Sequence, residues 1–125
     1  MYPEPTFRMF PVHVTLLSFQ TTVTGEAAIV ALAGELDVAG ASLLEHEIER
    51  IVTDHDSREL VLDLSGLEFM DSTGLRLMVL ADERAQRESR RLSLVRGQPD
   101  VQRVFEITRM TERLRFVDSV AEATE

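Results

Sequence analysis

The densest group of polar side chains in this sequence is the string Asp71-Ser72-Thr73-Gly74, which joins an apolar stretch to a segment with helical spacing. Asp, Ser and Thr are the residue types that begin helices, because their side chains accept hydrogen bonds from the free amides of the first turn. No Glu or Gln follows three residues after any of them, so the hydroxyls exceed what capping needs. A hydroxyl at a helix start can also carry phosphate, since the helix dipole and the free amides favour anions there.

Ser72 is the side chain of this string that we expect to carry the chemistry. Phosphate on Ser72 would add about −1.5 to −2 charges to an acidic surface, and a partner contacting that surface would lose affinity by repulsion. Gly74 supports this interpretation, because glycine in a first turn costs about 1 kcal/mol against alanine and leaves the helix start open to close approach. Taken alone, the same string is more commonly a plain helix cap with a packing glycine.

The sequence around this string predicts alternating strands and helices. Residues 14–23 and 28–32 are rich in β-branched and apolar side chains on either side of a Thr-Gly-Glu turn, which predicts a β-hairpin. The elements predicted after it are a helix over about 40–53 begun by Asp37 or Gly40, a strand at 60–64, a helix at 75–88, a strand at 92–95, a helix from Pro99, a strand at 114–117 and a helix after Ser119. The fold class is therefore α/β: one mixed sheet that opens with an antiparallel hairpin and continues in parallel βα units, with helices packed on it.

A single domain accounts for the length of 125 residues, which is enough to bury one core. Residues 1–12 hold prolines interspersed with Tyr2, Phe7 and Phe10, which predicts an N-terminal arm, and residues 13–125 form the predicted domain. The arm could wrap onto the domain or pair two copies as a weak homodimer.

Charge and residue usage argue against several function classes. The formal net charge of −9 repels a phosphate backbone, so nucleic-acid binding is not expected. All 13 basic residues are arginine, and a chain without lysine lacks the amine for Schiff-base chemistry or a Walker-type phosphate loop. Cysteine is absent and His13, His46 and His55 lack metal-ligand spacing, so we expect no metal or other cofactor. No apolar run approaches the about 20 residues that span a bilayer and the start does not resemble a signal peptide, which predicts a cytoplasmic protein without a membrane partner.

Two strings resemble the signatures of one family. Residues 69–75, Phe-Met-Asp-Ser-Thr-Gly-Leu, are similar to the motif of STAS-domain anti-sigma factor antagonists, and residues 34–37, Gly-Glu-Leu-Asp, match that family's other recognisable string. The resemblance extends over about residues 14–124. It implies a single STAS-like domain without enzymatic activity, which binds an anti-sigma factor that is itself a serine kinase. Phosphorylation of the serine after the aspartate then switches binding off.

Carried onto this sequence, the resemblance implies that Ser72 is the phosphorylation site. A phosphatase could restore the hydroxyl. Thr73 stands where the family commonly has a second serine, but its β-branched side chain has less rotational freedom. The implied partner-binding face combines the motif, the end of the earlier strand and the first turns of the helix: Asp37, Asp71, Ser72, Thr73, Gly74, Arg76 and Val79.

Three other functions fit parts of the sequence. A response-regulator receiver would share the strand-end acid Asp63, but it also needs a lysine near its last strand. A hydrolase would need Ser72 in a Gly-x-Ser-x-Gly turn with a histidine partner, and the sequence lacks that motif. A STAS interaction module in a signalling scaffold or a transport-associated subunit would use the same fold without a sigma factor. The retained serine favours regulation.

Overall fold

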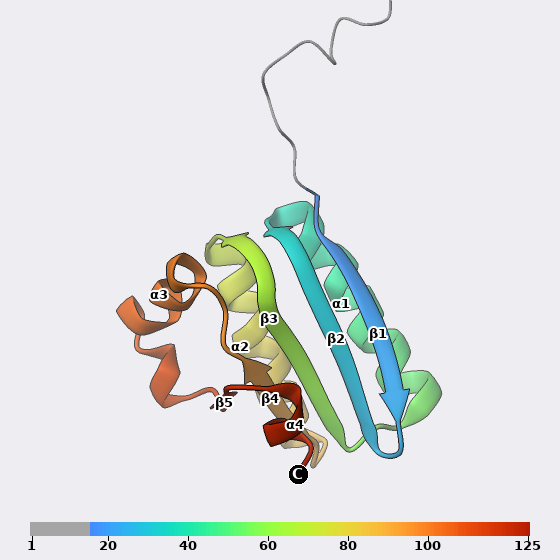
Figure 1. Ribbon diagram of the computed structural model, residues 1–125. Coiled ribbons are helices and arrows are strands. Elements are labelled where there is room, and N and C mark those ends of the chain that lie inside the picture. Colours follow the sequence, from blue (N-terminus) through green and yellow to red (C-terminus); the bar gives the residue numbers. More distant parts are fainter. Residues whose placement is uncertain (1–15) are drawn as a thin grey trace, which may run out of the picture.

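The computed structural model describes residues 16–125. The predicted arm over residues 1–12 and residues 13–15 of the predicted domain lie outside this range. The elements follow one another as β1 (Ser18–Thr24), β2 (Ala27–Leu36), α1 (Val38–His55), β3 (Glu59–Met70), α2 (Ser72–Arg87), β4 (Arg91–Val95), α3 (Pro99–Ile107), the 3₁₀ turn η2 (Met110–Glu112), β5 (Phe116–Val117) and α4 (Val120–Ala123), as Figure 1 shows.

The strands form one five-stranded sheet in the order β1-β2-β3-β4-β5, which is also their order in the chain. β1 runs antiparallel to β2 through a tight turn at Gly25, whose φ of 58° suits glycine. The other neighbouring pairs are parallel, so each is joined by a crossover that contains a helix. The predicted fold class, a mixed α/β sheet that opens with an antiparallel hairpin, is confirmed.

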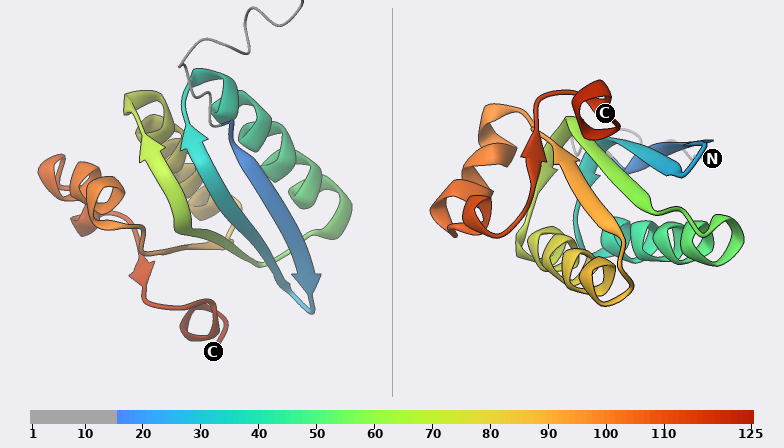
Figure 2. Two further views of the ribbon diagram at one scale, coloured as in Figure 1. Left: turned by 45° about the horizontal axis from the view of Figure 1, so that its top comes forward. Right: turned by 90° about the horizontal axis from the view of Figure 1, so that it is seen from below.

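Helices α1 and α2 pack side by side on one face of the sheet (Figure 2). Alternate residues of β2, among them Val30 and Leu32, belong to the buried core that these helices cover. The apolar stripe predicted for α1 is buried in the same core at Leu44, Ile48 and Ile51. The main core therefore lies between the sheet and this pair of helices.

The opposite face of the sheet carries the short helix α4. A smaller cluster packs there, made of Val61, Val95, Val117 and Ala123. Helix α3 lies beside the sheet and buries Phe105, whose ring meets Phe116 of β5 edge-on with the ring centres 5.0 Å apart. These contacts fix the C-terminal third of the chain.

Strand β3 is longer than the sequence predicts. The predicted end of the strand at residues 65–66 is wrong, because β3 continues to Met70. Gly66 permits this continuation: a Cβ on it would lie 2.8 Å from the carbonyl oxygen of Leu32, so a side chain there would collide with β2. The register between β2 and β3 shifts on either side of this contact. The added length carries the chain to the sheet edge where Ser72 lies.

Candidate functional site

The predicted site lies at the edge of the sheet where β2 and β3 end. Leu36 and Met70, the last residues of these parallel strands, are paired in register, and the backbone N–H of Asp71 donates to the carbonyl of Leu36 at 3.3 Å. Asp37 and Asp71 therefore follow two adjacent strand ends. The structure thus brings the Gly-Glu-Leu-Asp string and the Asp-Ser-Thr-Gly string together, as the sequence predicts.

Each of these two aspartates begins a helix. Oδ1 of Asp37 accepts the N–H of Gly40 at 3.0 Å, and Oδ1 of Asp71 accepts the N–H groups of Thr73 at 2.9 Å and Gly74 at 3.1 Å. Caps of this kind contribute about 1 kcal/mol each. Because Asp71 is the N-cap, α2 begins at Ser72, and the predicted helix start at residue 75 is wrong by one turn.

Ser72 is the first residue of α2, and it is exposed. Its hydroxyl takes no part in capping and makes no hydrogen bond to residues 16–125. An enzyme approaching from solvent can therefore reach Oγ of Ser72. Thr73 is partly buried and lines a groove beside α1, so the two hydroxyls differ in access.

Gly74 lies under the surface at this helix start. A Cβ on it would stand 2.7 Å from Cγ of Met70 and 2.9 Å from Cδ2 of Leu36. Its missing side chain therefore lets α2 approach the strand ends of its own chain. A buried glycine offers no contact to a partner directly, and Gly74 acts on the site through the position of α2.

A groove runs between α1 and α2 and starts next to Ser72. Its first part, about 230 Å³, is lined by Val38, Ala41, Ser42 and Glu45 of α1 and by Thr73, Arg76, Leu77 and Leu80 of α2. A second hollow of about 200 Å³ continues it along the same helices and adds Ile48, Ala81, Arg84 and Arg87. Val38 is 67% exposed and Leu80 is 46% exposed, so apolar surface borders the groove.

The other predicted site residues lie on α2. Arg76 is exposed and lines the groove, whereas Val79 is half-buried. Sequence reasoning missed Val38 and Leu80, because an apolar residue in an amphipathic helix is read first as part of the core. A usable signal for Val38 was its place directly after the cap residue Asp37.

Ion pairs tie the two helices together at the far end of the groove. The guanidinium of Arg84 donates to both carboxylate oxygens of Glu49, at 2.9 and 3.1 Å, and to Glu88 at 2.9 Å. These hydrogen bonds hold the pKa of the Glu49 and Glu88 carboxyl groups below the ordinary range of a glutamate. On α1, Arg50 lowers the pKa of Glu47 in the same way, and Thr21 of β1 donates to that carboxylate at 2.6 Å.

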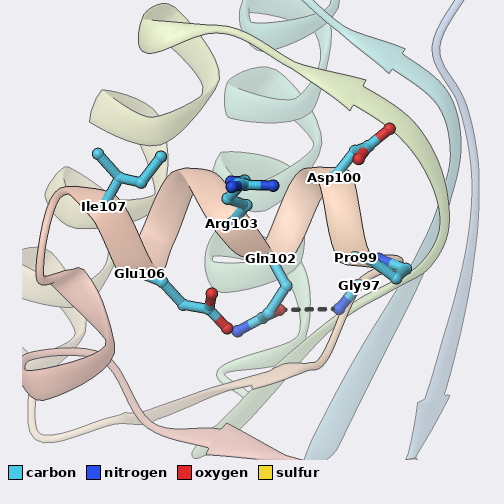
Figure 3. A pocket seen from close by; sticks show the side chains of 7 residues that line it. All are labelled: Gly97, Pro99, Asp100, Gln102, Arg103, Glu106 and Ile107. Carbon is cyan, nitrogen blue, oxygen red and sulfur yellow. Dashed lines mark hydrogen bonds between the residues drawn. The ribbon is translucent and has the colours of Figure 1, made fainter.

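A larger hollow of about 600 Å³ lies against α3 (Figure 3). Oε1 of Gln102 accepts the N–H of Gly97 there at 3.0 Å, and Asp100, Arg103 and Glu106 mix both signs of charge around the opening. It contains none of the predicted site residues. Because acidic and basic side chains alternate around its opening, this hollow does not favour one class of ligand.

The described residues contain neither a metal-binding cluster nor a membrane-spanning helix. Among residues 16–125, no group of three or more His, Cys, Asp or Glu side chains could hold a metal ion. No helix of that same range is both long and apolar enough to cross a bilayer.

Comparison with known proteins decides the family. Residues 18–123 match the model of the STAS domain, which covers most of the chain. The chain belongs to the STAS domain family. This confirms the resemblance seen in residues 34–37 and 69–75.

The relatives of this STAS domain are regulators. It is 37% identical over 57 residues to the anti-sigma-F factor antagonist RsfB of Mycobacterium tuberculosis, a match that covers 46% of each chain. The match thus spans about half the length of that curated relative.

Solved structures agree in fold and in class. An anti-sigma factor antagonist from Mycobacterium paratuberculosis superposes with a TM-score of 0.77 at 25% identity, covering 86% of this chain and 91% of the other. The Bacillus cell fate determinant SpoIIAA in its phosphorylated form gives 0.64 at 26% identity, covering 86% and 96%. These proteins are named for a regulatory class and not for an enzymatic one.

Proposed function

We propose that this STAS domain is an anti-sigma factor antagonist that binds a cognate anti-sigma factor with serine-kinase activity. Phosphorylation of Ser72 by that kinase switches the binding off. The observation that carries the proposal is the position of Ser72: an exposed hydroxyl, first in α2, left free by the cap and directly before Thr73, which lines the α1–α2 groove.

In the modification step this chain supplies only the acceptor. Oγ of Ser72 attacks the γ-phosphorus of ATP bound to the kinase, and a new O–P bond forms. The bond from that phosphorus to the bridging oxygen breaks, ADP leaves, and the hydroxyl proton passes to a base of the kinase. Asp71 stays occupied as the helix cap during this step, because its carboxylate holds two backbone amides.

The docking face joins polar and apolar surface around the serine. Asp37, Asp71, Thr73, Arg76 and Val79 retain the role proposed from the family resemblance, and Gly74 supports them by holding α2 in place. We add Val38 and Leu80, whose exposed side chains border the groove. A partner seated there would bury apolar surface beside Ser72, and a phosphate at its rim would then cost affinity through repulsion and desolvation.

Similarity to a protein known in a phosphorylated form supports this reading. SpoIIAA was solved in that form, and it shares 26% identity with this chain. The proposed kinase uses ATP, which places the switch in the cytoplasm, and a phosphatase would be needed to restore the hydroxyl.

The test is phosphorylation by candidate partners. The chain is incubated with ATP and each anti-sigma factor kinase of the same organism, and the product is mapped by mass spectrometry. We expect one phosphate, on Ser72, which is lost in Ser72→Ala and kept in the matched control Thr73→Ala. Phosphate on Thr73, or no phosphate from any of these kinases, would overturn the proposal and favour a STAS interaction module without a sigma factor.

A binding measurement completes this test. Ser72→Asp places a carboxylate at the same exposed position, so we expect it to weaken binding to the kinase while the melting temperature stays within about 2 °C, since an acid in a first helical turn is tolerated. A large loss of stability in this variant would instead show that Ser72 is chiefly structural.

A further inference from the structure

The cap of α2 already occupies most of the amides of its first turn. Oδ1 of Asp71 accepts two of them, and the carbonyl oxygen of Asp71 accepts the N–H of Leu75 at 3.1 Å. A phosphate on Ser72 would therefore lie near the carboxylate of Asp71. At an uncapped helix start it would find free backbone N–H donors instead. Asp37 caps α1 at the adjacent strand end and adds a second negative charge. Within the described residues, only the N–H of Ser72 remains for the phosphate among the amides of this turn, so a nearby cation would add to the stability of the phosphorylated site.

Arg76 is the cation that the helix supplies. It lies four residues after Ser72 and carries the one charge between Ser72 and Ala81. Both Ser72 and Arg76 are exposed. Within residues 16–125 Arg76 forms no ion pair, whereas Arg84 on the same helix pairs with two glutamates. The guanidinium of Arg76 is therefore uncommitted before phosphorylation.

Helix geometry directs Arg76 towards Ser72. Residues four apart are neighbours on one face, with their Cβ atoms about 5–6 Å apart. Helical side chains also lean towards the N-terminus, so the long side chain of Arg76 can reach back over the turn that holds Ser72. An acid that precedes its base by four residues is the favourable order for a helical ion pair. The planar guanidinium can bind two phosphate oxygens at once.

We infer that Arg76 binds the phosphate on Ser72 of its own helix. This internal ion pair, called the latch below, stabilises the phosphorylated state. The inference rests on the proposed phosphorylation and specifies how that modification acts. In this proposal Arg76 holds the phosphate in place and takes no part in the phosphoryl transfer.

The latch also changes the docking face. Arg76 lines the groove beside Thr73 and Leu80, where an acidic group of a partner could reach it. Once held by the phosphate, Arg76 is withdrawn from that contact. One modification thus adds negative charge to the face and removes its nearby positive charge, so the loss of affinity exceeds that from the phosphate alone.

The experiment measures the pKa of the phosphate itself. Phosphoserine is incorporated genetically at position 72 of the full chain, and the second phosphate pKa, ordinarily near 6, is read by ³¹P NMR titration. The variants are Arg76→Gln, Arg76→Lys and the control Arg87→Gln. Arg87 is an exposed arginine that lies about 22 Å from Ser72 along the helix axis. It forms no ion pair with the described residues.

A nearby cation favours the dianion, so we expect the phosphate pKa to be about 0.5 lower with Arg76 than with glutamine, and intermediate with lysine. Arg87→Gln should match the parent chain, and 1 M NaCl should shrink the difference, because the pair is exposed. The acids at the two helix starts and in the groove, Asp37, Asp71 and Glu45, are the same in every variant, so the comparison isolates the arginine.

Equal phosphate pKa values with and without Arg76 would overturn the latch. Since the phosphoserine is encoded, this outcome is independent of any kinase, and failure of the kinases to modify Ser72 would overturn the proposed function alone. Circular dichroism checks that α2 is intact. If Arg76→Gln disturbs the helix, Arg76→Ala replaces it, because alanine removes the charge and is the best helix former; a phosphate pKa equal to that of the parent chain would again overturn the latch.

Discussion

The first turn of α2 rests directly on the end of β2, because a Cβ on Gly74 would lie 2.9 Å from Cδ2 of Leu36. The same added carbon would lie 2.7 Å from Cγ of Met70 at the end of β3. Leu36 is fully buried and Met70 is 4% exposed, so neither side chain has free space to move into. The contact of Gly74 with these strand ends therefore sets where Ser72 stands above the sheet edge.

Gly74→Ala should destabilise the domain, although alanine is the better helix former. Helix propensity favours alanine by about 1 kcal/mol, whereas forcing a methyl group into a packed contact costs about 1–3 kcal/mol. We expect a net loss of about 1 kcal/mol in the free energy of unfolding, measured by urea denaturation. Ser42→Ala, at an exposed position of α1, is the control and should be neutral or slightly stabilising. A Gly74→Ala domain more stable than the parent would contradict this packing role.

The placing of the two aspartates follows from the resemblance of two sequence strings to the STAS family. The family resemblance placed Asp37 and Asp71 on one surface, and the pairing of Leu36 with Met70 bears this out, although the strand pattern alone ended β3 at residue 64. The α1 stripe was equally readable, because Leu44, Ile48 and Ile51 recur at helical spacing and are buried. The α1 stripe thus depends on local periodicity, whereas the place of Asp71 depended on the motif.

Two other features depend on contacts between distant residues and could not be read locally. Gly66 is compatible with a turn or with a strand, and its contact with the Leu32 carbonyl decides for the strand. Leu80 is apolar on an amphipathic helix, and only the position of α1 shows that it borders a groove. The choice of Asp71 as cap, among three residue types that all cap well, was likewise settled by the pairing of the strands.

The pair between Glu49 and Arg84 should make stability depend on pH in the acidic range. Arg84 lowers the pKa of Glu49 in the folded state below its ordinary value of 4.5. A carboxyl group whose pKa is lower in the folded than in the unfolded protein stabilises the fold at pH values above the unfolded-state pKa. This contribution is lost as the pH falls through the pKa of the folded state. We therefore expect Glu49→Gln to be slightly less stable than the parent at pH 7, with the difference narrowing from pH 5 towards pH 3.

The measurement is urea unfolding of both proteins across that pH range. Glu45→Gln is the control, since Glu45 lies on the same helix and forms no ion pair within the described residues. Because the Glu49–Arg84 pair is exposed, its contribution should be small and should fall further in 1 M salt. A difference between Glu49→Gln and the parent that stays constant from pH 7 to pH 3 would show that the pair does not stabilise the fold.

Leu80 gives the sharpest test of the docking face. Its side chain is 46% exposed at the α1–α2 groove, so its removal should cost the free domain little. If a partner covers this groove, Leu80→Ser removes an apolar contact from the centre of the interface, where truncations commonly cost 1 kcal/mol or more. We expect about a tenfold or greater loss of affinity for the unmodified domain in calorimetry, with an almost unchanged melting temperature. Leu43→Ser is the matched control, because Leu43 is 56% exposed on α1 but does not line the groove. Equal losses of affinity in the two variants would show that the partner does not recognise the groove.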